Sequence, residues 1–287
     1  MPHTLPKPIP DLTAQFHDRG FVILRDYFPQ SVVAAAREEM KTLVDEQARS
    51  LFRSGSITDL LENEPFETRL YKLYEGHTED VEGSWRAVLH LEGMHDIFFD
   101  EGILDLVEAL IGGEIRLYPN YTVRPKLPDH PETLVLWHQD GGYTEHWHKH
   151  GHGDVSDLRM VNTWTPLVPA RVENGCMQFV PGTHGMPLFR HEQREHYLEI
   201  PSELIEPHSD QFVDMEVDPG DVIIFHNMLC HRGLPNHSQT IRWSVDWRYQ
   251  DASQPTLRPQ EGHLARSRED PSRSVKSATE WANLSFQ

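Results

Sequence analysis

The spacing of hydrophobic residues changes near residue 115 of this 287-residue chain. Before that point apolar residues recur at intervals of three and four, the period of an amphipathic helix. Beyond it they form short runs divided by Gly, Pro and Asn, a pattern typical of strands and turns. The sequence therefore predicts a mainly β protein with flanking helices.

The first part of the chain is predicted to contain three helices and a strand. Residues 11–20 form a short helix that stops at Gly20, and residues 21–28 form a strand. A long helix runs from Ser31 to about Phe52, and another runs from Ile103 to Ile111. Residues 1–9 contain three prolines and are expected to be a loose arm, while residues 53–95 are a candidate lid.

The second part is predicted to fold into short strands, which suggests a sandwich or a barrel. We expect a double-stranded β-helix, the cupin-type jelly roll, in a single domain over residues 1–287. The polar residues 252–287 are expected to be a surface tail or a covering arm. The predicted strands are residues 115–124, 133–138, 160–167, 176–182, 212–217, 221–225 and 241–249.

The composition of the chain limits the classes of binding partner that we expect. A formal net charge of −19 argues against a nucleic-acid-binding surface. The chain has no run of 18 apolar residues and no secretory leader pattern, so neither a membrane partner nor export is expected. Two cysteines fit a reducing cytoplasm. We expect a cytoplasmic monomer or homodimer that acts on a small molecule.

Three candidate metal ligands are the most specific chemical signal. His138 and Asp140 stand two residues apart in LWHQDGG, and His231 follows 93 positions after His138. Two histidines and one carboxylate form the facial triad of non-heme Fe(II) oxygenases, which leaves positions open for a co-substrate and O₂. Asp140 is decisive, because Gly or Ala there would leave room for a halide and favour halogenation.

The segment that contains His231 and Arg242 favours an oxygenase over the alternative functions. His-x-Asp is weak evidence alone in a chain with 19 histidines. Eleven residues after His231 comes Arg242, a cation suited to hold the far carboxylate of a bidentate acid. A cupin-like metal-binding or scaffold protein with a vestigial site is one alternative, but a scaffold does not need this arginine. A zinc hydrolase is another, but no general base accompanies the triad.

The motifs HQD, NGCMQFVPGTHG, PGDVIIFH and CHRGLPNHSQTIRWS resemble the phytanoyl-CoA dioxygenase family of Fe(II)/2-oxoglutarate enzymes over roughly residues 10 to 250. The resemblance implies iron on His138, Asp140 and His231, with 2-oxoglutarate and O₂ consumed and succinate and CO₂ released. The implied reaction is hydroxylation of a metabolite or natural-product intermediate, with desaturation, cyclisation or epoxidation as other outcomes.

The same resemblance implies a co-substrate pocket. The position of Arg242 pairs with the C5 carboxylate of 2-oxoglutarate, and the positions of Gln139 and Trp164 line the pocket in some members. Many members have a serine two residues after the distal histidine, where this chain has Gly233. Ser244, two residues past Arg242, is a candidate to supply the missing hydroxyl.

Candidate substrate residues lie on either side of the triad. Asn120, Thr122 and Arg124 alternate along one predicted strand, so Arg124 is expected to face the interior and bind a substrate carboxylate. Tyr143 and Trp147 follow the predicted strand that ends at His138, and they are expected at the entrance of the pocket. Histidines at positions 146, 148, 150 and 152 suggest a second metal site or, as we favour, a polar loop.

Overall fold

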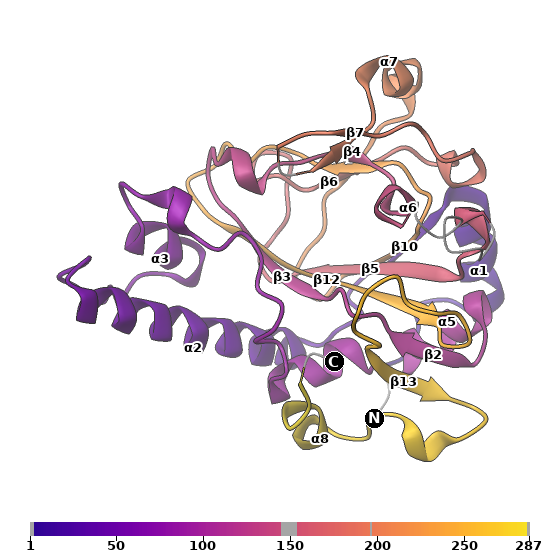
Figure 1. The fold of residues 1–287 in the computed structure, drawn as a ribbon, viewed down its shortest axis with the longest axis horizontal. Coiled ribbons are helices and arrows are strands. Elements are labelled where there is room, and N and C mark those ends of the chain that lie inside the picture. The colour runs from indigo at the N-terminus through magenta and orange to yellow at the C-terminus, as the bar shows by residue number, and fades with distance from the viewer. Residues whose placement is uncertain (1–2, 145–153, 196, 286–287) are drawn as a thin grey trace.

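The computed structural model describes residues 3–144, 154–195 and 197–285. Two β-sheets lie one over the other, and helices cover the outer face of the larger sheet (Figure 1). In the view of Figure 1 the smaller sheet lies above the larger one, and the long helix α2 lies below it. The fold is therefore mainly β with flanking helices, as the sequence predicts.

The larger sheet has seven strands, all in antiparallel pairs. Its order is β1-β10-β5-β12-β2-β13, and β3 also pairs with β12. The strands are β1 (Phe21–Leu24), β2 (Glu114–Leu117), β3 (Thr122–Lys126), β5 (Met160–Pro166), β10 (Val222–His226), β12 (Arg242–Asp251) and β13 (His263–Ser267).

The smaller sheet has the order β4-β11-β6-β9. Its strands are β4 (Val135–His138), β6 (Met177–Phe179), β9 (Val213–Met215) and β11 (His231–Gly233). His231 is the register partner of His138, so sheet pairing alone places two of the predicted ligands side by side. A separate hairpin joins β7 (Glu192–Gln193) and β8 (Leu198–Glu199).

Helices bury the apolar face of the larger sheet. The α-helices are α1 (Ile9–Arg19), α2 (Gln30–Ser54), α3 (Phe66–Leu73), α4 (His95–Phe98), α5 (Glu101–Ile111), α6 (Asp140–Tyr143), α7 (Ser202–Ile205) and α8 (Ala278–Ala282). Short 3₁₀ helices are η1 (Thr78–Asp80), η2 (Glu92–Met94), η3 (Pro131–Thr133), η5 (Val155–Asp157), η6 (Thr183–Gly185), η7 (Glu206–Gln211) and η8 (Pro271–Arg273).

Strand β12 shows how the sequence separates core from pocket. Its alternate residues Trp243, Val245, Trp247 and Tyr249 are fully buried in the core that the helices share. Trp243 stacks on Phe66 at 4.9 Å between ring centroids, for example. The residues between them are polar, and because neighbours on a strand point to opposite faces, they face the smaller sheet.

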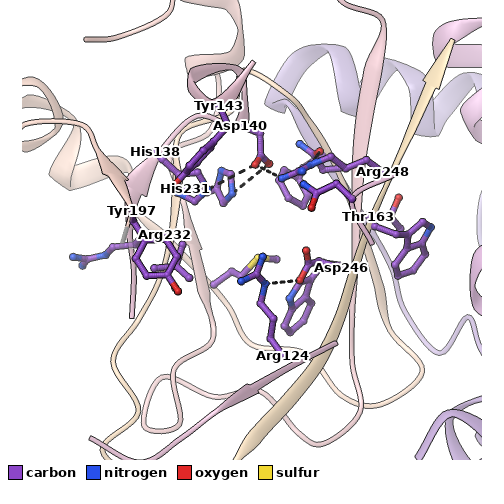
Figure 2. Close-up of a pocket in the computed structure, with 18 of the residues that line it drawn as sticks. Arg124, His138, Asp140, Tyr143, Thr163, Tyr197, His231, Arg232, Asp246 and Arg248 are labelled. Carbon is purple, nitrogen blue, oxygen red and sulfur yellow. Dashed lines mark hydrogen bonds and ion pairs between the residues drawn. The ribbon is translucent and has the colours of Figure 1, made fainter. Parts of the chain in front are cut away.

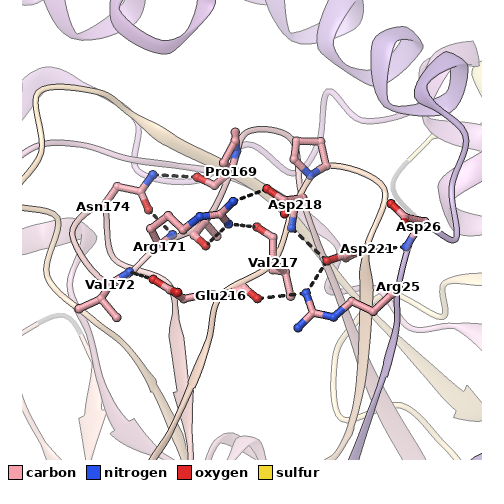
Figure 3. A network of polar contacts seen from close by, with 12 residues as sticks. Arg25, Asp26, Pro169, Arg171, Val172, Asn174, Glu216, Val217, Asp218 and Asp221 are labelled. Atoms are coloured by element: carbon pink, nitrogen blue, oxygen red, sulfur yellow. Dashed lines mark hydrogen bonds and ion pairs between the residues drawn. The ribbon is translucent and has the colours of Figure 1, made fainter.

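A charged network holds the turn Pro219-Gly220-Asp221, which precedes β10. We call this the turn network (Figure 3). Buried Asp221 accepts hydrogen bonds from Arg25 at 2.6 Å and from the backbone N–H of Asp26 at 2.9 Å. Arg171 pairs with Asp218 in the same network. Gly220 has φ +110°, and a Cβ there would lie 2.7 Å from the Phe28 carbonyl oxygen, so the turn requires glycine.

Two predictions about elements are wrong. Residues 115–124 form two strands rather than one, because Pro119 has no N–H for a sheet hydrogen bond and interrupts the run. Asn120 therefore lies in the connection, not on the strand that carries Arg124. The segment 252–287 is not a surface tail alone. Its strand β13 belongs to the larger sheet, and its Trp281 is fully buried.

The segments expected to be mobile are packed against the domain. His3, in the predicted arm, contacts Asp100 at 2.7 Å. Within the candidate lid, the backbone of Trp85 forms a bridge with Val123 of β3, and the Trp85 side chain is buried. Among the described residues, no helix is long and apolar enough to cross a membrane.

Candidate active site

The three predicted metal ligands meet at the ends of two strands of the smaller sheet. His138 ends β4, Asp140 begins α6 and His231 begins β11. One ligand atom from each residue lies within 4.8 Å of the others, and all three residues are buried. The Nε2 atoms of His138 and His231 lie 3.9 and 3.7 Å from the Asp140 carboxylate oxygens. The arrangement presents two imidazoles and one carboxylate to a common point (Figure 2).

Backbone carbonyls fix the orientation of both imidazoles. The Nδ1 atom of His138 lies 2.8 Å from the Leu136 oxygen, and that of His231 lies 2.9 Å from the Leu229 oxygen. A carbonyl only accepts, so each Nδ1 carries the proton and each Nε2 keeps a free lone pair toward Asp140. Metal-binding histidines use this same arrangement to fix their tautomer.

The electrostatics of the site favour the metal-binding protonation states. Burial lowers the pKa of His138 to about 3 and also lowers the pKa of His231. Burial acts in the opposite direction on Asp140, but the charge of Arg248 and the two histidines lower its pKa to about 2. Near neutral pH the site therefore offers two neutral imidazoles and an ionised carboxylate.

Arg248 is a site residue that the sequence interpretation missed. It donates to the Asp140 carboxylate, and its Nε donates to the Asn162 side-chain oxygen at 2.9 Å. Arg248 follows Arg242 by six residues on β12, so both lie on the same face of that strand. The alternation of polar and aromatic residues in RWSVDWRY was the available signal.

Arg242 stands on the wall of the same cavity, above the ring of Trp164 at 5.3 Å. It is buried, and burial lowers the pKa of its guanidinium to about 10. Its one hydrogen bond given by the described residues goes to the Ser244 hydroxyl, and its Nε has no partner there. A buried guanidinium without a carboxylate is suited to receive an anion.

The Gln139 side chain is buried behind the metal ligands. Its side-chain nitrogen donates to the Met228 oxygen at 2.8 Å, and its side-chain oxygen accepts from the Phe189 N–H at 2.8 Å. It does not line the cavity, because consecutive residues of an extended chain point in opposite directions and His138 and Asp140 face inward. Ser244 also contributes to the wall only through Arg242.

The cavity has a volume of about 250 Å³ and lies between the two sheets. Arg124 lines it and pairs with Asp246, with 2.7 Å between Nε and Oδ1 (Figure 2). Asn120 and Tyr143 line it as well, whereas the Thr122 hydroxyl donates to the Trp85 oxygen at 3.0 Å. Trp147 and the histidines at positions 146–152 lie outside the described residues.

Two further arginines reach the cavity from segments that the sequence interpretation did not connect with it. Arg86 belongs to the predicted lid and Arg258 to the predicted tail. Neither has an acidic partner among the described residues, and the Arg86 Nε has no hydrogen bond there. Burial and the charges of neighbouring arginines lower the pKa of both guanidiniums.

Comparison with known proteins gives a consistent assignment. The family model described as "Phytanoyl-CoA dioxygenase (PhyH)" matches residues 16–244. A relative from Streptomyces arenae, named 1-deoxypentalenic acid 11-beta-hydroxylase, is 26% identical over 253 residues, covering 83% of this chain and 80% of the relative. "Dioxygenase lolE1" of Epichloe uncinata is 41% identical over 90 residues, 30% of this chain and 32% of the relative.

Among solved structures, EctD from S. alaskensis with 2-oxoglutarate and 5-hydroxyectoine has a TM-score of 0.61 at 19% identity. The alignment covers 96% of this chain and 89% of EctD. At this identity the likeness concerns the fold alone, which nearly the whole chain shares with EctD.

Proposed function

The chain belongs to the phytanoyl-CoA dioxygenase (PhyH) family, and we propose that it hydroxylates a small molecule that carries an anionic group. It is an Fe(II)/2-oxoglutarate-dependent oxygenase, and the predicted family resemblance is confirmed. The observation that carries this conclusion is a buried His138–Asp140–His231 cluster facing a cavity that also contains Arg242. Its co-substrates are 2-oxoglutarate and O₂, and its co-products are succinate and CO₂.

The donor set fits Fe(II). His138, Asp140 and His231 would hold the ion through two neutral nitrogens and one carboxylate, which suits a facial triad. When bound, the iron supplies O₂ activation coupled to decarboxylation of 2-oxoglutarate. Arg248 holds the Asp140 carboxylate in place, so the ligand geometry exists before the metal binds.

Arg242 and Trp164 fit the co-substrate. The unpartnered Nε of Arg242 would pair with the far carboxylate of 2-oxoglutarate, and the Trp164 ring packs beside the guanidinium. Ser244 orients Arg242 through its hydroxyl and does not itself line the cavity. Gln139 does not contact the co-substrate. Its side chain hydrogen-bonds to the backbone of Met228 and of Phe189, and so supports the iron ligands from behind.

The charges on the cavity wall support an anionic substrate. Six arginines and two aspartates line it: Arg86, Arg124, Arg232, Arg242, Arg248 and Arg258, with Asp140 and Asp246. Asp140 and Asp246 already pair with Arg248 and Arg124, Arg232 donates to the Gln178 side chain, and Arg242 is assigned to 2-oxoglutarate. Arg86 and Arg258 are left without a carboxylate among the described residues, in a chain whose net charge is −19. We assign them to a carboxylate or similar anion of the substrate.

Three further polar atoms at the cavity are proposed to form hydrogen bonds with the substrate. The side-chain oxygen of Asn120, the side-chain nitrogen of Asn162 and the Thr163 hydroxyl are buried at the cavity without hydrogen bonds within the described chain. A substrate hydroxyl would donate to the Asn120 oxygen, and substrate oxygens would accept from the Asn162 nitrogen and the Thr163 hydroxyl. Arg124 keeps a role in positioning through its pair with Asp246, and Tyr143, which also lines the cavity, contacts the substrate.

The strand order supports a double-stranded β-helix as the finer description of the fold. In chain order β3, β4, β5, β6, β9, β10, β11 and β12 form eight antiparallel strands. One sheet contains β3-β12-β5-β10 and the other β4-β11-β6-β9, which is the connectivity of a cupin-type jelly roll. We further propose that the whole chain acts as one domain, as a cytoplasmic monomer or homodimer.

A paired-substrate screen tests the substrate class. The purified enzyme with Fe(II) and 2-oxoglutarate is given metabolite carboxylic acids and the matching methyl esters, and succinate and product are measured. We expect turnover with an acid, and weak or no turnover with its ester. Arg86→Met and Arg258→Met should each raise the KM for that acid about 10-fold, as expected for loss of a charged contact.

Exposed Arg53 at the end of α2 provides the control, since Arg53→Met should leave this KM unchanged. Equal turnover of acid and ester would reject the anionic substrate while leaving the oxygenase assignment intact. Absence of any substrate-dependent succinate formation across the screen would count against hydroxylation itself.

A further inference from the structure

Lys126 is a buried cation whose ammonium has no partner among the described residues. Its side chain is 2% exposed, and its Nζ makes no hydrogen bond there. Burial lowers its pKa well below the ordinary range of lysine, and the charges of Arg242 and Arg124 lower it further. An isolated charge in such surroundings is costly unless an anion joins it.

Sheet register directs Lys126 toward the co-substrate end of the cavity. Lys126 on β3 is the direct partner of Arg242 on β12, and Arg124 is the partner of Ser244. Partners across an antiparallel pair project to the same face. Because Arg124 and Arg242 both line the cavity, Lys126 projects toward the same interior.

Two glycines make the slot that Lys126 occupies. A Cβ at Gly175 would lie 2.7 Å from the Lys126 Cε, and a Cβ at Gly233 would lie 2.9 Å from its Nζ. Gly233 itself lines the cavity. The family resemblance leads one to expect a serine at this position, two residues after His231. The Lys126 ammonium lies where a side chain at position 233 would begin.

Among the described residues, no free carboxylate accompanies Lys126 and Arg242. The acidic group that acts on both is the Cys176 thiol, and burial raises its pKa to about 12, so it is neutral. Asp246 is already paired with Arg124. Lys126 and Arg242 are therefore two neighbouring buried basic groups, and a bound carboxylate would hold both in their charged forms.

We propose that Lys126 is the second cation of the 2-oxoglutarate site, and that it replaces the missing hydroxyl by contacting the C5 carboxylate beside Arg242. This inference rests on the proposed function. It differs from the expectation that Ser244 fills this role, since the Ser244 hydroxyl is occupied by Arg242. A lysine in this place makes the co-substrate site depend on a dianionic acid more strongly than a hydroxyl would.

Anaerobic calorimetry on the Fe(II)-loaded protein tests the proposal without turnover. We expect Lys126→Met to weaken 2-oxoglutarate binding about 10-fold, the effect of one lost charged contact. Binding of 2-oxopentanoate, which lacks the distal carboxylate, should hardly change. The unfolding temperature of the free variant should equal or exceed that of the wild type, because a buried unpaired charge has been removed.

The position of Gly233 allows a rescue. Its backbone is not in the left-handed region, so a side chain is tolerated once the lysine is shortened. In the Lys126→Met background, Gly233→Ser should recover most of the lost affinity. Lys41→Met on the exposed face of α2 is the matched control and should leave both affinities unchanged.

The possible failures are distinguishable. Wild-type protein that does not bind 2-oxoglutarate would refute the proposed function rather than this inference. Wild-type binding together with an unchanged affinity in Lys126→Met would refute Lys126 alone. An equal loss for 2-oxoglutarate and 2-oxopentanoate, or no recovery on adding Gly233→Ser, would show that the lysine does not stand in for the hydroxyl at the distal carboxylate.

Discussion

The turn network and the cavity both gather charged side chains beside strands of the larger sheet, but only in the turn network does each arginine have an acidic partner among the described residues. In the turn network Arg25 pairs with Asp221 and Arg171 with Asp218, and the remaining contacts go to backbone groups (Figure 3). In the cavity the pairs Arg248–Asp140 and Arg124–Asp246 are likewise matched. Among the described residues, Arg86, Arg242 and Arg258 on the wall have no carboxylate partner, and neither does Lys126, the register partner of Arg242; Arg232 donates to the neutral Gln178 side chain.

The difference separates charges that hold the fold from charges that await a ligand. A buried ion without a partner lowers stability, so a structural network has no reason to contain one. The cavity wall contains several, and we assign them to two different ligands. Arg242, with its register partner Lys126, is assigned to the co-substrate, while Arg86 and Arg258, which come from outside the strands that carry the triad, are assigned to the substrate.

The largest effect should come from removing the ligand carboxylate in the cavity. Asp140→Ala deletes one of three metal ligands and leaves Arg248 without its partner. We expect succinate formation that depends on 2-oxoglutarate to be lost and the iron content of the purified protein to fall. The fold should persist, since Asp140 lies at a strand end, and circular dichroism checks this. Wild-type turnover in this variant would remove Asp140 from the iron site.

A smaller effect is expected at the unmatched arginine of the co-substrate end. Arg242→Ala should raise the apparent KM for 2-oxoglutarate 10-fold or more, roughly the 1.5–3 kcal/mol of a charged hydrogen bond. Steady-state succinate assays over a range of 2-oxoglutarate concentrations measure it. The apparent KM for a 2-oxo acid without a distal carboxylate should change little in the same variant. An unaltered KM would place the anchor elsewhere in the cavity.

Substitutions in the turn network should change the stability of the protein rather than its binding of 2-oxoglutarate. Asp221→Asn removes the buried charge that Arg25 and the Asp26 N–H contact, and we expect a loss of about 1–3 kcal/mol in the free energy of unfolding. Arg25→Met should cost less, because the Arg25 side chain is 54% exposed. Denaturant titration gives these values. A changed KM for 2-oxoglutarate in the folded Asp221→Asn protein would show that the two regions are coupled.

Sequence patterns predicted the parts of the molecule that depend on local order. The helices over residues 31–52 and 103–111, most strands, and the spacing of His138, Asp140 and His231 all follow from periodicity or short motifs. The pairs Arg248–Asp140 and Arg124–Asp246 join positions 108 and 122 residues apart, and only strand register brings them together. Likewise, nothing local indicates that Arg86 and Arg258 reach the same cavity, because their segments have no regular period.

The smallest effect, and the one that most sharpens the comparison, concerns the matched pair within the cavity. Arg124→Leu leaves the triad and Arg242 in place, so 2-oxoglutarate should still be consumed slowly. Product should fall relative to succinate by several-fold, because the pair with Asp246 shapes the wall near the substrate and small displacements of a reacting group are costly. The measurement is the ratio of product to succinate, with exposed Arg53→Leu as the control. If Arg124 only stabilises the fold, as Arg25 does in the turn network, this variant will be less stable but will keep the wild-type ratio.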